Sequence, residues 1–156
     1  MIYRRSFLMA MGPLAFALPN PGVPDFQGKS LDGAAFSKAS LKGKPVLIQF
    51  WATWCGYCRR DQPAVEEIVE RYRGRLTVLA VSVREDRSTV QRYLERSPRK
   101  SRIVLTEDTN LTTVFDPRGF PYYVMLNSEG RMVGEQPGAG GKEGLQELLA
   151  RAGFSN

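Results

Sequence analysis

The chain has 156 residues, with 22 lysine and arginine residues against 16 acidic residues and a net charge of +6. This length fits one domain with a short leader, and a hydrophobic content of 42% is enough to form a core without structural metals. The sequence has no histidine, which excludes imidazole catalysis and histidine metal sites, and its two cysteines cannot form a closed four-ligand zinc site within one chain.

Residues 1–17 have the pattern of an export signal. Arg4 and Arg5 precede an apolar stretch over 7–17, which is too short to span a bilayer as a helix and ends in an A-x-A cleavage pattern. The segment around the two arginines resembles the R-R-x-F-L core of twin-arginine signals, while a Sec signal and an uncleaved N-terminal anchor are the alternatives. We expect export to the periplasm or another extracytoplasmic site, followed by a linker over 18–22 and one domain over 23–154.

The domain is predicted to begin with a β-hairpin, because single apolar residues over 25–44 alternate with glycines suited to turns. A continuous apolar run over 45–52 then predicts a central strand that is buried on both faces. This strand leads directly to Cys55, and apolar residues at helical spacing follow over 63–72.

The second half of the domain is predicted to alternate strands and helices before it closes with a hairpin and a helix. The expected elements are a strand over 76–83, a helix around 90–94, a strand over 103–105, a hairpin of 122–126 with 132–133, and a helix around 145–149. This order predicts an α/β fold with a central mixed β-sheet, helices on both of its faces, and an N-terminal β-hairpin extension.

Cys55-Gly56-Tyr57-Cys58 is a C-x-x-C motif at the point where a helix is expected to begin. Unpaired N–H groups at a helix N-terminus carry partial positive charge, which stabilises a thiolate on the first cysteine. Two intervening residues let the second sulfur resolve a mixed disulfide. We therefore assign Cys55 as the exposed nucleophile and Cys58 as the more buried resolving thiol.

A static structural disulfide and half of an intermolecular metal site are the alternative interpretations of this motif. A bridge that closes so short a loop constrains the unfolded chain very little, so a purely structural role is disfavoured. Trp51 and Trp54 just before the cysteines, together with the strand-to-helix context, favour redox activity. Covalent haem attachment is excluded because Arg59 stands where that chemistry requires histidine.

The segment over 50–58, FWATWCGYC, resembles the thioredoxin active-site signature, and Pro63 matches the proline that kinks the family's first helix. The segment over 119–130 is similar to the family's cis-proline loop and the hairpin that follows it. Lead-in motifs over 24–44 resemble those of the TlpA/ResA-like exported thioredoxins, and the likeness covers about residues 23–152. It implies a thioredoxin-like fold and a thiol–disulfide oxidoreductase that uses its own cysteine pair, without a cofactor or a metal.

The resemblance also implies which residues contact substrate. Pro121 is expected to form a cis peptide bond and to face the cysteines, with Phe120 offering backbone groups to an extended substrate. Trp54, Gly56 and Tyr57 complete the predicted substrate-binding set.

Asp61 stands where the TlpA/ResA-like proteins usually carry glutamate, three residues after the second cysteine. Its carboxylate either carries a proton for the resolving thiol or is a first-turn acid stabilised by the helix dipole. Gln49 occupies the position of a buried aspartate in thioredoxin, and a neutral amide cannot act as a base. If Gln49 fills that site, Asp61 or water must take the proton instead.

The leading functional prediction is a reductase of disulfides in exported client proteins, which the resemblance implies for cytochrome c maturation or copper-site assembly. Such a protein would be a monomer that draws electrons from a membrane thiol donor, since no reductant pool exists outside the cytoplasm. Three alternatives stay open: a disulfide-forming oxidase or isomerase, a peroxiredoxin-like peroxidase, and a module that binds partners at Phe120 and Pro121 without turnover.

Basic residues cluster late in the second predicted helix and just beyond it, at Arg96, Arg99, Lys100 and Arg102. They are expected to form a solvated face, with attraction of an acidic partner as the alternative. No interleaved aromatic stripe accompanies them, so we expect no nucleic-acid partner.

Overall fold

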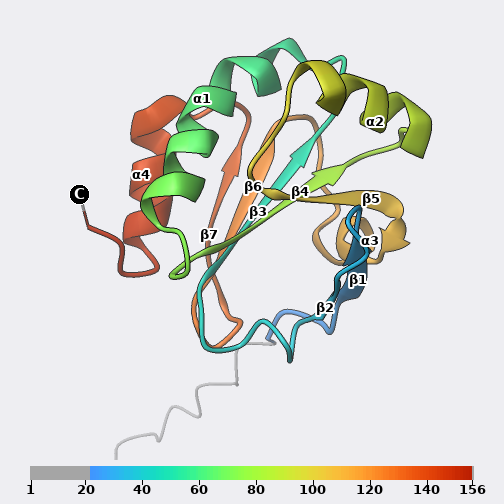
Figure 1. Ribbon diagram of the computed structural model, residues 1–156. Helices are drawn as coiled ribbons and strands as arrows, with labels where there is room; N and C mark the ends of the chain where they lie inside the picture. Colours follow the sequence, from blue (N-terminus) through green and yellow to red (C-terminus); the bar gives the residue numbers. More distant parts are fainter. Residues whose placement is uncertain (1–21, 156) are drawn as a thin grey trace, which may run out of the picture.

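The computed structural model describes residues 22–155, so the predicted signal over 1–17 and nearly all of the linker over 18–22 lie outside the described part. One seven-stranded sheet, in the order β2-β1-β5-β4-β3-β6-β7, organises the described residues (Figure 1). Its strands are β1 (Gln27–Ser30), β2 (Ala35–Ser37), β3 (Val46–Trp51), β4 (Thr77–Ser82), β5 (Arg102–Thr109), β6 (Tyr122–Leu126) and β7 (Met132–Pro137). Its helices are α1 (Gly56–Arg71), α2 (Arg87–Arg96), α3 (Leu111–Phe115) and α4 (Gly141–Ala150).

The centre of the sheet is β3, whose six residues are all buried. It pairs in parallel with β4 and antiparallel with β6, and β4 pairs in parallel with β5. Because crossovers between parallel strands are right-handed, α1 and α2 cover the same face of the sheet. Figure 1 shows α4 on that face as well and α3 on the other. The β1–β2 hairpin extends the sheet beyond β5. The predicted α/β fold, with a mixed sheet, helices on both faces and an N-terminal hairpin, is confirmed.

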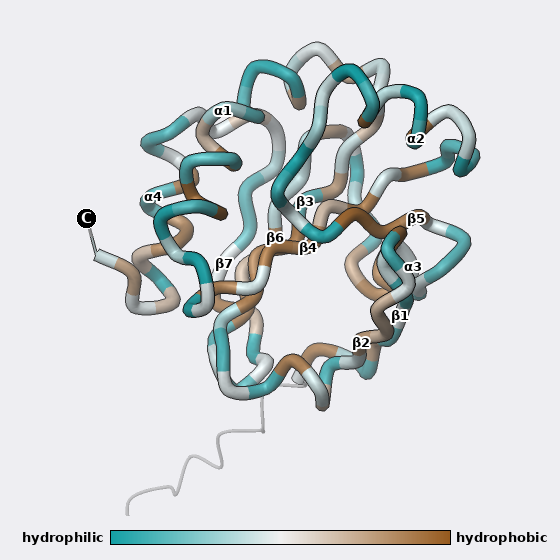
Figure 2. Tube along the Cα trace, in the orientation of Figure 1, coloured by the Kyte–Doolittle hydropathy of each residue, from teal (hydrophilic) through white to brown (hydrophobic). Residues whose placement is uncertain are grey.

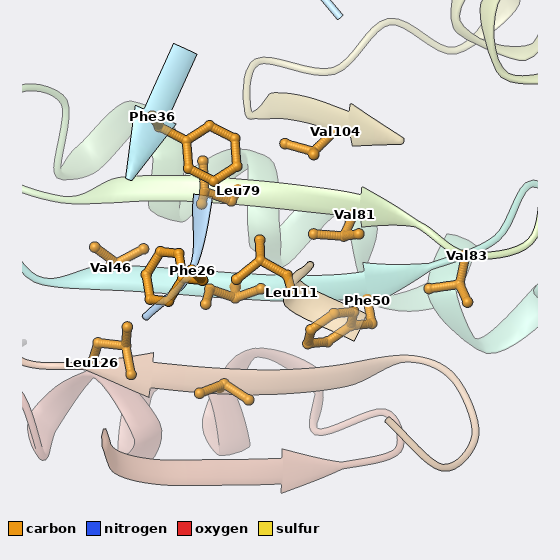
Figure 3. Packing of buried hydrophobic residues seen from close by; sticks show 12 residues of the cluster. Phe26, Phe36, Val46, Phe50, Leu79, Val81, Val83, Val104, Leu111 and Leu126 are labelled. Carbon is orange, nitrogen blue, oxygen red and sulfur yellow. The ribbon is translucent and has the colours of Figure 1, made fainter. Parts of the chain in front are cut away.

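Alternating side chains of β3 divide the core between the two faces of the sheet. Leu47 packs with residues of α1 and α4, whereas Ile48 and Phe50 point to the opposite face. Figure 3 shows this second cluster, in which Phe26 from the lead-in and Leu111 from α3 cover the strands. Figure 2 shows hydrophobic residues concentrated in the central strands, while the trace of α2 is mostly hydrophilic.

Several predicted elements differ in extent from the structure, and one was missed. Strand β5 has eight residues instead of three, because its second half pairs with β1 through Gly28 and Thr109. Strand β7 runs to Pro137, four residues beyond its predicted end, while the closing helix α4 begins at Gly141, before the expected span. The five-residue α3 is too short to show a helical period in sequence, although its Leu111 is fully buried.

The segments that form the candidate site meet at one end of the central strands. Strand β3 ends at Trp51 just before the cysteines, and the parallel strand β4 ends at Ser82 beside it. Antiparallel β6 starts at this same end of the strands, with Tyr122 opposite Phe50. The C-x-x-C motif, the loop after β4 and the segment before β6 therefore converge at one end of β3. Between residues 22 and 155, no helix has the length and hydropathy needed to cross a membrane.

Candidate active site

The C-x-x-C motif forms the first turn of α1. Cys55 is the N-cap residue with an extended backbone, and its sulfur accepts a hydrogen bond from the N–H of Cys58 at 3.1 Å. The two cysteines are joined by a disulfide with a Cα–Cα distance of 5.2 Å. The Cys55 sulfur thus meets the partially positive N–H groups that a helix leaves unpaired at its start.

Both sulfur-bearing residues are buried in the disulfide form. Cys55 is 4% exposed and Cys58 is fully buried, so the predicted order of burial holds, while the prediction of an exposed Cys55 is wrong for this form. The reason is a cluster in which the cysteines pack with Trp51, Ala52 and Phe120. A partner sulfur can therefore reach the pair only at Cys55, because Cys58 has no exposed surface.

Exposed aromatic rings flank the two cysteines. Trp54 is 67% exposed and meets Phe120 edge-on with ring centroids 6.1 Å apart. Tyr57 is 61% exposed and carries the Arg60 guanidinium 5.0 Å from its ring centroid. Exposed large aromatic side chains beside a reactive group are suited to binding a partner chain, since each offers a large apolar face and loses little conformational entropy on binding. Gly56, between Cys55 and Tyr57, is also exposed.

The Phe120–Pro121 segment lies against the cysteines. The peptide bond between these residues is cis, as the resemblance implied. Pro121 is buried, Phe120 is half-buried against the cluster that contains both cysteines, and the register of β6 continues Pro121 toward the end of β3. The structure thus brings Trp54 and Phe120 together beside the disulfide from two segments far apart in sequence. Of the other predicted substrate-binding residues, Gly56 and Tyr57 lie between the cysteines and Pro121 follows Phe120.

Asp61 is buried beneath the site, with 2% exposure, on the same helix as the cysteines. Its Oδ2 accepts hydrogen bonds from the Tyr123 hydroxyl at 3.0 Å and the Gly140 N–H at 3.1 Å, and its Oδ1 accepts one from the Gly141 N–H at 3.0 Å. Gly140 and Gly141 begin α4. Asp61 lies beyond the first turn of α1, so the idea that the α1 dipole stabilises it there is wrong; the N-terminus it meets belongs to α4.

Tyr123 is held as a hydrogen-bond donor to this carboxylate. Burial raises the pKa of the Tyr123 hydroxyl well above its usual value, and the charge of Asp61 raises it further. The phenol therefore stays protonated through the working pH range. Asp61 keeps one of its carboxylate lone-pair positions free, because three of about four are occupied.

Gln49 links this carboxylate region to a half-buried arginine. Its amide nitrogen lies 3.5 Å from the Tyr123 hydroxyl, and its oxygen lies 3.5 Å from Nη1 of Arg99. The Arg99 guanidinium sits 3.6 Å from the ring centroid of Trp51, a cation–π contact. Burial lowers the pKa of Arg99, but a guanidinium remains charged in proteins, so a fixed cation lies beneath the strand that leads to the cysteines.

The basic cluster is only partly the solvated face that was predicted. Arg99 packs inward on Trp51, where its planar cation lies over the aromatic face. The Lys100 ammonium forms an ion pair with Glu70 at 3.1 Å, and the backbone N–H of Lys100 donates a hydrogen bond to the Glu66 carboxylate. Arg96 and Arg102 keep solvent contact.

Glu85 is a site residue that the sequence did not reveal. It follows β4, and its carboxylate accepts hydrogen bonds from the Thr53 N–H at 2.9 Å, from the Thr53 hydroxyl and from the Ser82 hydroxyl at 2.9 Å. These three hydrogen bonds to Glu85, the Glu85 clamp, hold the turn that carries Trp54 and Cys55. No local pattern marks it, because the contact spans 32 residues of sequence.

Replacing Glu85 by Gln is expected to loosen this turn. One carboxylate oxygen becomes an NH2 group that faces donors, so the free energy of unfolding should fall by about 1–3 kcal/mol. Urea unfolding measures the loss, and Glu107→Gln, at an exposed carboxylate 3.5 Å from Arg87, is the matched control with an expected change below about 0.5 kcal/mol. Equal losses in the two variants would contradict the clamp.

Within residues 22–155, no group of three or more acidic or cysteine side chains is placed to hold a metal ion. The reactive group of this site is the Cys55–Cys58 disulfide, accompanied by the buried Asp61 carboxylate and the exposed rings of Trp54 and Tyr57.

Comparisons with known proteins also indicate thiol–disulfide chemistry. A model of the family described as Redoxin matches residues 19–149. The thiol-disulfide oxidoreductase ResA of Halalkalibacterium halodurans is 27% identical over 126 residues, which cover 80% of this chain and 72% of the relative. A thiol:disulfide interchange protein of the thioredoxin family from Chlorobium tepidum is 26% identical, with a TM-score of 0.71 and coverage of 84% and 94% of the two chains. StoA from Bacillus subtilis, at 20% identity, a TM-score of 0.69 and coverage of 81% and 97%, shares the fold.

Proposed function

The chain belongs to the Redoxin family and is a thiol–disulfide oxidoreductase, and we propose that it reduces disulfides in exported client proteins. The observation that carries the proposal is the position of the Cys55–Cys58 disulfide, at the N-terminus of α1 and against the Phe120–Pro121 segment. Exposed Trp54 and Tyr57 beside it offer a surface for a client chain.

In the proposed reaction, the reduced protein gives two electrons to the client. The Cys55 thiolate attacks one sulfur of the client disulfide, forms a mixed disulfide and releases the other client sulfur as a thiolate. Cys58 then attacks the Cys55 sulfur, which forms the Cys55–Cys58 disulfide and releases the second client thiolate. Assigning attack to Cys55 is supported by its remaining exposure, since Cys58 has none.

We assign to Asp61 the role of base for Cys58 in this second step. The two residues lie three apart on the buried face of α1, the spacing that places side chains on one side of a helix. Gln49 cannot take a proton, and Tyr123 already donates its own to Asp61. The free lone-pair position on the carboxylate leaves room for the thiol proton.

The reductive direction is supported by the resemblance to the TlpA/ResA-like proteins, as are clients in cytochrome c maturation or copper-site assembly. Export rests on the signal pattern over 1–17. Outside the cytoplasm the Cys55–Cys58 disulfide must be reduced again by a membrane thiol donor, because no soluble reductant pool is available there.

A two-way turnover assay tests the proposed direction. We expect the pre-reduced protein to reduce a disulfide-bonded protein such as insulin much faster than the oxidised form introduces disulfides into a reduced, unfolded protein. Faster oxidation than reduction would instead identify a disulfide-forming oxidase, and rapid consumption of hydrogen peroxide by the reduced form would identify a peroxidase.

The role of Asp61 predicts a pH-dependent defect in Asp61→Asn. Loss of a general base should slow resolution of the mixed disulfide about 10- to 100-fold at pH 7, and the deficit should shrink above pH 9, where free thiols ionise unaided at a pKa of about 8.5. Stopped-flow decay of a preformed mixed disulfide between pH 6 and 10 measures this, with Asp61→Glu as the control that keeps a carboxylate. A pH-independent deficit would assign Asp61 a structural role through its bonds to α4.

A further inference from the structure

An open groove lies between the turn that carries Trp54 and one side of α2. Its volume is about 740 Å³, and its lining includes Trp54, Arg59, Arg92, Arg96 and Glu95. Trp54 immediately precedes Cys55, so a chain seated in the groove lies next to the sulfur that attacks.

The charge of this groove is strongly positive. Three arginines line it against one glutamate, Glu95. Among the residues that the structure describes, none of these arginines forms an ion pair within the protein. Arg59 instead donates a hydrogen bond of 3.1 Å from Nη1 to the Thr53 carbonyl.

Two carboxylates close to the groove form no ion pair with its arginines in the described part of the chain. Asp86, at the start of α2, accepts hydrogen bonds from the Thr89 N–H and the Ser88 hydroxyl, both at 2.7 Å, and these bonds hold the pKa of its carboxyl below the usual value, with a contribution from the charge of Arg92. Glu85 is occupied by Thr53 and Ser82. The groove arginines therefore have free donors for an incoming anion.

We propose that this groove binds an acidic segment of the client, close to the client disulfide. This inference rests on the proposed function and adds the class of client. Because Trp54 of the groove precedes Cys55, a disulfide-bearing polypeptide can fill the groove and present its disulfide to Cys55 at the same time, which a free anion cannot do. Aspartate and glutamate side chains match the forked guanidinium donors, and exposed charges of opposite sign speed the encounter at low salt.

Matched peptide substrates test the inference. Three synthetic peptides carry the same internal disulfide, flanked by acidic residues, by their neutral amides, or by lysines. We expect the reduced wild-type protein to show a kcat/KM about tenfold higher for the acidic than for the neutral peptide at 20 mM salt, and nearly equal values at 500 mM salt. The Arg92→Glu plus Arg96→Glu variant should reverse the preference in favour of the lysine peptide.

The control variant is Lys42→Glu plus Lys44→Glu, which makes the same change in net charge in exposed residues before the opposite end of β3. It should keep the preference for the acidic peptide. Equal rates for acidic and neutral peptides at low salt would overturn the groove proposal while leaving the reductase intact. Failure to reduce any peptide would overturn the proposed function itself.

Discussion

Cys55→Ser is expected to abolish turnover, with a fall in kcat/KM for disulfide reduction of about 10³-fold or more. A serine hydroxyl does not ionise at neutral pH, and the thiolate is the nucleophile in thiol–disulfide exchange. The second cysteine cannot substitute, because Cys58 is fully buried under the cluster that contains Trp51 and Phe120. A coupled assay with dithiothreitol as electron donor and a disulfide-bonded peptide as substrate measures the loss.

Loss of the fold must be separated from loss of the nucleophile. The Cys55–Cys58 bridge closes a loop with a sequence separation of only 3, so removing it should change the free energy of unfolding little. The reduced wild-type protein is the matched reference for urea unfolding, since it lacks the bridge but keeps both thiols. Turnover by a folded Cys55→Ser variant at near wild-type rates would reject a redox role, as would unchanged activity of that variant in cells.

Cys58→Ala is expected to stop after the first chemical step. Cys55 can still attack the client, but no thiol is available to attack the mixed disulfide, so the client stays attached. The product should be a one-to-one adduct that accumulates over a single turnover and is released by dithiothreitol. Mass spectrometry of the adduct and non-reducing gels of extracts from the exported compartment measure it.

The control for trapping is the double variant Cys55→Ser plus Cys58→Ala, which keeps the Trp54 and Phe120 surface but has no attacking sulfur. It should capture nothing covalently. Capture by the double variant, or a Cys58→Ala variant that turns over repeatedly, would contradict the division of roles between the two cysteines.

Local patterns were sufficient to predict most of the fold. The strand over 45–52 and the helical spacing after it are dictated by apolar residues close together in sequence, and the structure places β3 and α1 there. The extent of β5 was missed because its last residues pair with β1, a contact between Gly28 and Thr109 that no local period reports. Helix α3 was missed because five residues do not make a period.

Site residues that stand in local motifs could be predicted from the sequence, whereas contacts between distant parts of the chain could not. Cys55, Cys58 and Pro121 stand in motifs that can be recognised along the chain. The clamp of Glu85 on Thr53, the N–H groups of α4 on Asp61 and the stacking of Arg99 on Trp51 join residues 32 to 80 positions apart. Arg99 was expected in solvent because a sequence of basic residues shows charge but not the aromatic face that one of them covers.

The equilibrium reduction potential of the Cys55–Cys58 pair tests the reductase proposal most directly. Titration against thiol–disulfide buffers, followed by the fluorescence of Trp51 and Trp54 next to the cysteines, gives this value for the thioredoxin-like domain. A reductase of exported clients requires a potential more negative than about −200 mV, toward the value of about −270 mV known for thioredoxin. A potential near about −120 mV, as in a strong oxidant, would contradict the proposal and assign the protein to disulfide formation.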